Sequence, residues 1–131
     1  MLAAPASQSF ADSPEQTAIM AVMHSMFDEP NVELIIGPVV VEAGFAVADW
    51  IQGDMGGRAF LKEDAARWTL VLCAGDEIRL VEALKASGVP AGTAERLAST
   101  IAEAEKSIPA DRLKKFASFQ GIMRMDAQAQ H

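Results

Sequence analysis

Residues 50–76, W-I-Q-G-D-M-G-G-R-A-F-L-K-E-D-A-A-R-W-T-L-V-L-C-A-G-D, decide the fold of this chain. Gly53, Gly56 and Gly57 surround Asp54 and Met55 between two apolar runs, a composition typical of a tight turn. A second, polar break at residues 63–66 precedes the apolar run 67–73. Together with the run 45–52, this spacing predicts three strands that follow one another as an antiparallel meander.

The run 67–73 is apolar on both of its sides. Trp68, Leu70 and Leu72 alternate with Thr69, Val71 and Cys73, so either face of such a strand would be mostly hydrophobic. A strand of this kind is expected in the middle of a sheet that is covered on both faces. The cover could come from helices of the same chain or from a partner subunit, and the second alternative would make the protein a homodimer.

Upstream of the meander, the sequence predicts a helix and further strands. Ser13 and Gln16 enclose Pro14 in a pattern that caps a helix, and Asp28 to Asn31 would stop it. Residues 32–36 and 39–43 are rich in branched apolar side chains, with a break at Gly37-Pro38. The sheet should therefore hold three to five strands. The apolar stripe expected along the helix is Ile19, Val22, Met23, Met26 and Phe27.

Downstream of the meander, the sequence predicts three helices. The first would be capped by Asp76 and end at Gly88, the second would follow Pro90 and the third would follow Pro109. Glu105 is expected to face water on the second helix. Segregated strands and helices make an α+β domain at residues 14–125, between a flexible lead at 1–13 and a flexible tail at 126–131. The side chains expected to point inward are Ile78, Leu80, Val81, Leu84, Ala94, Leu97, Ile101, Ala104, Ile108, Leu113, Phe116 and Ala117.

Composition narrows the classes of function. A chain of 131 residues that is half apolar is the size of one domain. Its net charge of −7 would repel phosphate backbones, so we expect no nucleic-acid partner. No run approaches the roughly 20 apolar residues of a transmembrane helix. Cys73 is the sole cysteine and lies in an apolar run without a partner base, so we expect a buried, inert thiol and no enzyme activity.

Methionine and histidine are the strongest candidates for chemistry. Met20 and His24 are four residues apart on the predicted first helix, at the edge of its apolar stripe, and could share one soft metal ion. Met55, Met123 and Met125 are further candidate ligands, as is the terminal His131. Thioether and imidazole ligands together suit Cu(I). The plain alternative is an exposed histidine beside methionines that fill gaps in the core.

Asp49 is the most conspicuous carboxylate, because it lies inside the apolar run A-V-A-D-W. A buried charge requires a partner, and Arg58 or Arg67 on a neighbouring strand could supply it. The sequence leaves two interpretations open, a structural ion pair and general acid chemistry.

Several segments resemble a small bacterial family. They are P-V-V-V-E at 38–42, residues 50–59 and 67–76, G-V-P-A-G-T-A-E-R-L-A at 88–98 and F-Q-G-I-M-R-M-D at 119–126. Over residues 15–126 the chain resembles the copper uptake system-associated proteins, and the Gly-Asp-Met-Gly-Gly-Arg turn is the most specific segment. The resemblance implies a periplasmic or secreted protein linked to copper handling, with a membrane component of copper uptake as a partner. It carries over no catalytic residue, and only Met55, Met123 and Met125 as contacts.

Two functions from different classes follow. The first is a non-enzymatic accessory protein of bacterial copper uptake, which captures Cu(I) weakly through Met20, His24, Met55, Met123 and Met125 or docks to a transporter. The second is a ligand-binding or protein-interaction domain with a helix on a curved sheet, as in cystatin-like or nuclear-transport-factor-like folds. In that case Trp50, Asp54, Arg58 and Trp68 would line the concave face. A cytoplasmic location is compatible with the sequence as well.

Overall fold

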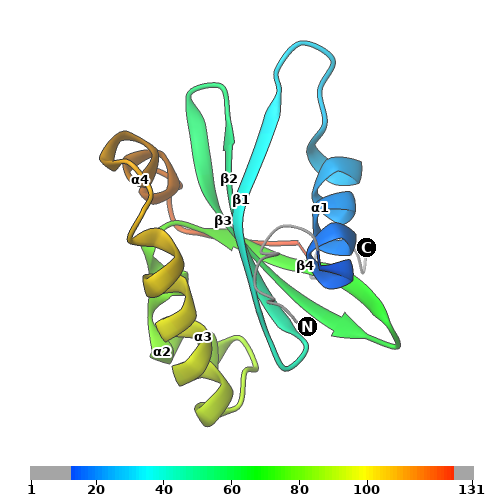
Figure 1. The fold of residues 1–131 in the computed structure, drawn as a ribbon, viewed down its shortest axis with the longest axis vertical. Coiled ribbons are helices and arrows are strands. Elements are labelled where there is room, and N and C mark those ends of the chain that lie inside the picture. Colours follow the sequence, from blue (N-terminus) through cyan, green and yellow to red (C-terminus); the bar gives the residue numbers. More distant parts are fainter. Residues whose placement is uncertain (1–12, 126–131) are drawn as a thin grey trace, which may run out of the picture.

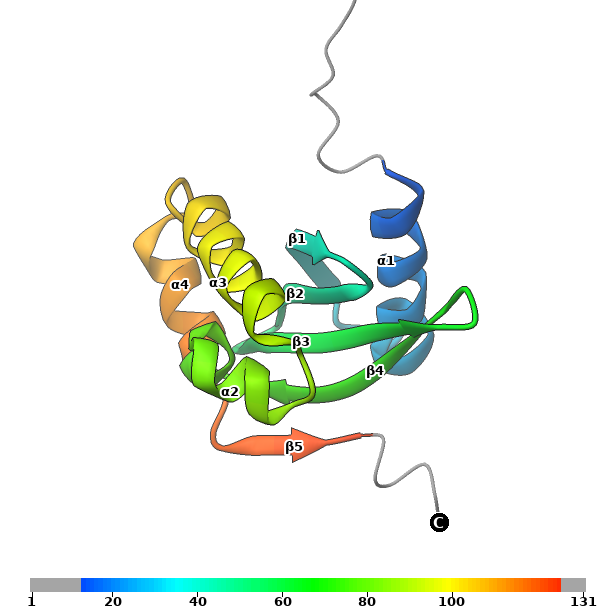
Figure 2. The same cartoon turned by 90° about the horizontal axis from the view of Figure 1, so that it is seen from below.

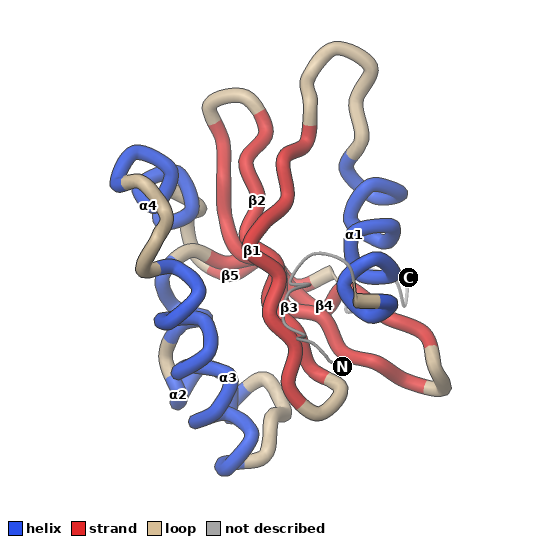
Figure 3. The backbone as a smooth tube through the Cα atoms, viewed as in Figure 1, coloured by secondary structure: helices blue, strands red, loops and turns tan. Residues whose placement is uncertain are grey.

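The computed structural model describes residues 13–125, and the predicted lead and tail lie almost wholly outside this range. Its centre is a five-stranded antiparallel sheet in which the strands follow one another in sequence order, β1-β2-β3-β4-β5 (Figures 1 and 3). This arrangement confirms the predicted meander. The strands are β1 (Leu34–Glu42), β2 (Phe45–Gln52), β3 (Met55–Asp64), β4 (Arg67–Ala74) and β5 (Ile122–Arg124).

Helix α1 (Pro14–Phe27) begins where the sequence predicts. The Ser13 hydroxyl accepts the backbone N–H of Gln16 at 3.1 Å, and the Gln16 side chain lies 3.4 Å from the Ser13 backbone N–H. This capping box satisfies donors that a helix start leaves without partners. One side-chain prediction for α1 is wrong, because Met26 is 51% exposed. Only Ile19 and Met23 are fully buried on this helix.

Three helices and a short 3-10 turn follow the first four strands. They are η2 (Asp76–Arg79), α2 (Val81–Ala86), α3 (Ala91–Glu105) and α4 (Ala110–Ala117). Figure 2 shows α1 on one face of the sheet and α2, α3 and α4 on the other. The protein is therefore an α+β domain, as predicted. Within residues 13–125, no helix combines the length and the hydrophobicity needed to span a membrane.

The sheet separates two hydrophobic clusters. One joins Ile19 and Met23 of α1 to the tryptophans Trp50 and Trp68. The other joins strand residues such as Phe60 to buried residues of α2 and α3. Both faces of β4 are thus covered by helices of the same chain. The cover predicted for its two apolar sides therefore comes from within the chain. Burial of this strand needs no second subunit.

Two glycines of the 53–57 segment, Gly56 and Gly57, have a different role from the predicted one. Only Gly53 has the positive φ, 64°, of a turn residue, and Met55 already belongs to β3. A Cβ at Gly56 would lie 2.6 Å from the Lys115 carbonyl oxygen, and one at Gly75 would lie 2.8 Å from the Phe119 carbonyl oxygen. Glycine is required here because α4 and the segment after it press their backbones against β3 and β4.

Strand β1 is longer than the sequence predicted. It continues through Gly37-Pro38, which forms a cis peptide, and the pairing with β2 shifts register between Ile36 and Val39. The predicted break is therefore an irregularity within one strand. Proline is tolerated because β1 is an edge strand, whose outer side needs no N–H donor for another strand.

Four further predictions for the C-terminal half are wrong, and one of them is the inward position of Ala117, which is exposed at the end of α4. Asp76 caps no helix, because Gly75 is the residue before η2 and the Asp76 carboxylate binds Arg58 instead. Leu80 is exposed, since it lies at the junction between η2 and α2. Glu105 was expected in water and is buried. In addition, the short strand β5 was not predicted, because three exposed residues carry no alternating pattern.

Candidate functional site

A groove of about 810 Å³ runs along the edge of the sheet between α1, β1 and α3. Its floor is β1 around Val39, and its walls include Met20 of α1 and Ala104 of α3. Strand β1 ends the sheet on this side, so its outward backbone groups face the groove and not another strand of the described chain. The Gln16 side chain donates a hydrogen bond of 2.8 Å to the Val39 carbonyl oxygen and occupies one of these positions.

A buried ion cluster lies on the opposite side of α3, where this helix approaches β3. Arg58 is 1% exposed and binds Glu105 through two hydrogen bonds, Nε to Oε2 at 2.9 Å and Nη2 to Oε1 at 2.8 Å. Its Nη1 donates to Asp76 Oδ1 at 2.9 Å. The guanidinium also lies over the Phe116 ring, 5.7 Å from its centroid. Such a forked, charge-assisted contact fixes α3 and η2 to the sheet.

Asp49 is the last member of the cluster. Of the two partners that the sequence allows for it, Arg58 and Arg67, the structure places Arg58 beside it. The two residues are directly paired across β2 and β3, and Asp49 Oδ1 lies 3.7 Å from Arg58 Nε. The other oxygen, Oδ2, makes no hydrogen bond to a described group within ordinary limits. Arg58 therefore directs its hydrogen bonds to Glu105 and Asp76, and Asp49 receives only a longer-range attraction from Arg58.

The two buried carboxyls have pKa values shifted in opposite directions. Burial, followed by the hydrogen bond and the charge of Glu105, raises the pKa of Asp49 to about 10. Burial also acts to raise the pKa of Glu105, but hydrogen bonds from Arg58 and Asp49 outweigh it and lower this pKa. At neutral pH the cluster thus contains a protonated Asp49 beside an ionised Glu105. Paired carboxyls in different protonation states are the arrangement that acid–base chemistry uses, and also one that structural clusters use.

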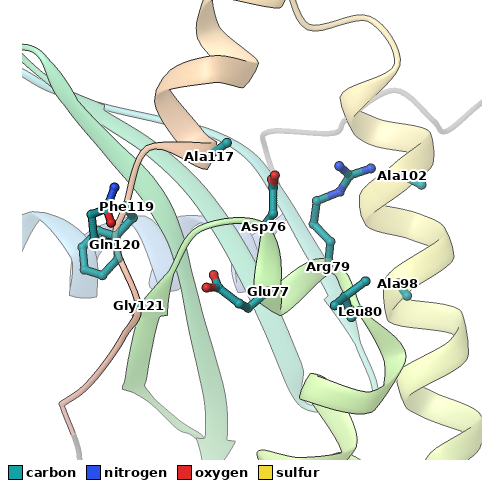
Figure 4. A pocket seen from close by; sticks show the side chains of 10 residues that line it. All are labelled: Asp76, Glu77, Arg79, Leu80, Ala98, Ala102, Ala117, Phe119, Gln120 and Gly121. Atoms are coloured by element: carbon teal, nitrogen blue, oxygen red, sulfur yellow. The ribbon is translucent and has the colours of Figure 1, made fainter.

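The cluster reaches solvent through two adjoining clefts. One, of about 630 Å³, lies between η2, α3 and the segment after α4, and Figure 4 shows Asp76 and Arg79 pointing into the gap between α3 and α4. The other, of about 430 Å³, shares Asp76 and Arg79 and has Arg58 and Glu105 in its lining. Asp76 is the most accessible carboxylate of the cluster, with 64% of its side chain exposed.

Sequence reasoning missed Glu105, although a signal for its burial was present. Glu105 follows Ala94, Leu97 and Ile101 at intervals of eleven, eight and four residues, which places it on the same face of α3. All four are buried. The charge of Glu105 predicts exposure, whereas its position on the helix places it in the core. A buried glutamate on an apolar stripe also implies a buried cation, which is Arg58.

The five predicted metal ligands are distributed over several elements. Met20 and His24 lie on α1, Met55 begins β3, Met123 lies in β5, and Met125 follows that strand. Met20 and Met125 are partly buried against the cluster under α1. His24 Nδ1 lies 2.7 Å from Asp28 Oδ1, so this imidazole already has a carboxylate partner. His131 lies outside the described residues.

Met55 and Met123 are the exposed members of the set, with 62% and 47% of their surface accessible. Their thioethers are available to solvent, as the sequence predicted for Met55. Over residues 13–125, no three His, Cys, Asp or Glu side chains gather in a group that could hold a metal ion.

The four residues predicted for a concave ligand face do not share one surface. Trp50 and Trp68 are buried in the cluster under α1, where Trp50 stacks on Phe27 with ring centroids 6.0 Å apart. Arg58 lies on the opposite face, and Asp54 is exposed in the turn between β2 and β3. The reason is the two-residue period of a strand: Trp50 pairs with Gly57, so Arg58 must point the other way. Core side chains fill the space between α1 and the sheet.

Cys73 is buried on the same face as Trp50. Burial raises the pKa of its thiol to about 11, although the Trp50 indole offsets part of the rise. A thiol with a raised pKa is a poor nucleophile at neutral pH. The location agrees with the buried thiol that the sequence predicts.

Comparisons of the chain with family models, with curated proteins and with solved structures give no match.

Proposed function

We propose that the protein is a non-enzymatic accessory protein of bacterial copper uptake that works by docking to a membrane component of the uptake system. The link to copper and a periplasmic location rest on the sequence resemblance. The docking mode rests on one observation, the groove over the edge strand β1. The partner proposed for this groove is an extended, apolar protein segment.

Three properties of the groove support an extended segment as its occupant. Edge strand β1 offers backbone donors and acceptors to a further strand, the mode of binding called β-strand addition. The groove walls are mainly apolar side chains, which favours alternate apolar residues in the added segment. The Gln16 side chain already donates a hydrogen bond to the Val39 carbonyl oxygen. An added segment would therefore pair with β1 from the next outward-facing residue, Val41.

Filling the groove tests this proposal. Ser107 is exposed and lines the groove, and Ser107→Trp would occupy it with an indole without adding charge. Ser99→Trp introduces the same side chain at an exposed position of α3 outside the groove. In a host strain that lacks the gene, we expect wild type and Ser99→Trp to restore copper accumulation and Ser107→Trp to fail. Unchanged copper accumulation in the deletion strain would refute the link to copper, and full activity of Ser107→Trp would refute docking in the groove.

Direct capture of Cu(I) is a second candidate, favoured by the exposed thioethers of Met55 and Met123. Competition with a Cu(I) chelator measures it. We expect the double variant Met55→Leu/Met123→Leu to lose affinity for Cu(I). Met26→Leu, at an exposed methionine outside the proposed set, should bind as wild type does. Equal affinity of all three proteins would exclude these two methionines as ligands.

A further inference from the structure

The smaller cleft beside the ion cluster has an unusual charge for this protein. Four cationic side chains line it, Arg58, Arg79, Lys106 and Lys114, against two acidic ones, Asp76 and Glu105. The formal charge of the lining is therefore +4 − 2 = +2, whereas the whole chain carries −7. The negative charge of the whole protein repels small anions. A cleft with a local excess of positive charge attracts them instead. We call this site the cationic cleft.

Arg58 in the cationic cleft is held rigidly and retains unused donors. A guanidinium has five N–H donors. In Arg58, two of these donors bind Glu105 and one binds Asp76. Only 1% of its surface is exposed and its partners fix its plane, which is how arginine is prepared for the recognition of carboxylates and phosphates. The carboxylate of Asp76, mostly in solvent, is itself an example of the group that this position accepts.

The other three cations lie at the surface of the cleft. Arg79, Lys106 and Lys114 are all exposed. The Lys106 ammonium pairs with Glu103 at 3.1 Å, a contact between two exposed side chains of α3. Arg79 Nε lies 3.7 Å from Glu105 Oε1. The exposed Lys106–Glu103 pair is weak, so Lys106 can turn toward a ligand at little cost, whereas the half-exposed Arg79 is already directed toward the buried Glu105.

We propose that the cationic cleft binds a small dianion that carries carboxylate or phosphate groups. One anionic group takes the place of the Asp76 carboxylate on Arg58 Nη1, and Arg79, Lys106 and Lys114 surround the remainder. The cleft volume of about 430 Å³ accommodates a ligand of this size. The site is distinct from the docking groove, because Ala102 and Lys106 of α3 line the cleft, whereas Glu103 and Ala104 line the groove.

This arrangement gives Asp76 the role of an internal competitor. Removing its charge with Asp76→Asn should free Arg58 for the ligand and raise the affinity, whereas Lys114→Gln should lower it. Each change is expected to be about fivefold, the usual effect of one partly exposed charge. A merely structural role of Asp76 would leave the affinity unchanged or reduce it, so the direction of the change is diagnostic.

Calorimetric titration of the full chain with succinate and with inorganic phosphate tests the proposal, with sodium chloride at matched ionic strength as the reference. We expect saturable heat with at least one of the two anions, tighter binding by Asp76→Asn and weaker binding by Lys114→Gln. Lys62→Gln removes the same charge at an exposed position of β3 and should bind as wild type does. Circular dichroism verifies that the variants are folded. No saturable binding by wild type, or an equal loss in Lys62→Gln and Lys114→Gln, would overturn the proposal.

Discussion

Arg58 is under a strong structural constraint, because it neutralises Glu105, a carboxylate whose side chain is only 4% exposed. Arg58→Met keeps an unbranched, although shorter, side chain and removes its charge, which leaves the ionised Glu105 buried without its guanidinium partner. Breaking a buried pair from one side costs about 3–5 kcal/mol. We expect the free energy of unfolding, measured by urea denaturation, to fall by an amount in this range.

The matched control is Arg67→Met at the exposed first residue of β4. This substitution should change the free energy of unfolding by no more than about 0.5 kcal/mol. The double variant Arg58→Met/Glu105→Met removes both charges and should recover much of the loss, since apolar replacement of a whole buried pair is often neutral. Equal effects of the two arginine variants would contradict the role assigned to Arg58.

Helix α4 packs against β3 through backbone contact rather than through side chains alone. A Cβ at Gly56 would lie 2.6 Å from the Lys115 carbonyl oxygen, a distance that real Cβ atoms do not tolerate. Gly56→Ala should therefore force α4 away from the sheet and lower the free energy of unfolding by about 1–3 kcal/mol, the usual cost of overpacking. The midpoint of urea denaturation measures the change.

Gly92→Ala in the first turn of α3 provides the comparison. Its Cβ would meet no atom closer than 3.7 Å. Alanine favours helices over glycine by up to about 1 kcal/mol, so this variant should be neutral or stabilised. If Gly56→Ala were as stable as Gly92→Ala, the close approach of α4 to β3 would not exist in solution.

Gly56 and Gly92 illustrate which parts of the fold local sequence patterns predict and which parts they do not. Local signals were sufficient for α1, whose cap is adjacent in sequence, and for strands β2 to β4, whose apolar runs are continuous. Gly56 and Gly57 were assigned to a turn, because their contacts with Lys115 and Phe119 come from residues about 60 positions away. The predicted cap at Asp76 fails for the same reason, since its partner Arg58 lies on strand β3, 18 positions earlier. Long-range contacts of this kind leave no trace in local composition.

At the scale of the whole molecule, the two buried carboxyls should shape the dependence of stability on pH. The pKa of Asp49 is raised from 3.8 to about 10, so between these values the folded state keeps a proton that the unfolded state has lost. Stability from this group therefore decreases as the pH rises. The pKa of Glu105 is lowered from 4.5, so its contribution is present above that value and is lost as the pH falls through the lower, folded-state pKa. The pair should make the fold most stable in mildly acidic solution.

Asp49→Asn isolates the first of these effects, because the amide has the shape of the protonated carboxyl and never ionises. Above pH 5 the free energy of unfolding of wild type should decrease, whereas that of the variant should not. The difference between the two free energies should widen by about 1 kcal/mol per pH unit, close to the limit for one proton. Urea denaturation at pH 5, 6, 7 and 8 measures this difference. Asp54→Asn, at an exposed carboxylate of the β2–β3 turn, should follow the wild-type curve. Parallel curves for wild type and Asp49→Asn would mean that Asp49 is ionised in the folded protein, and Arg58 would then have to neutralise two buried carboxylates rather than one.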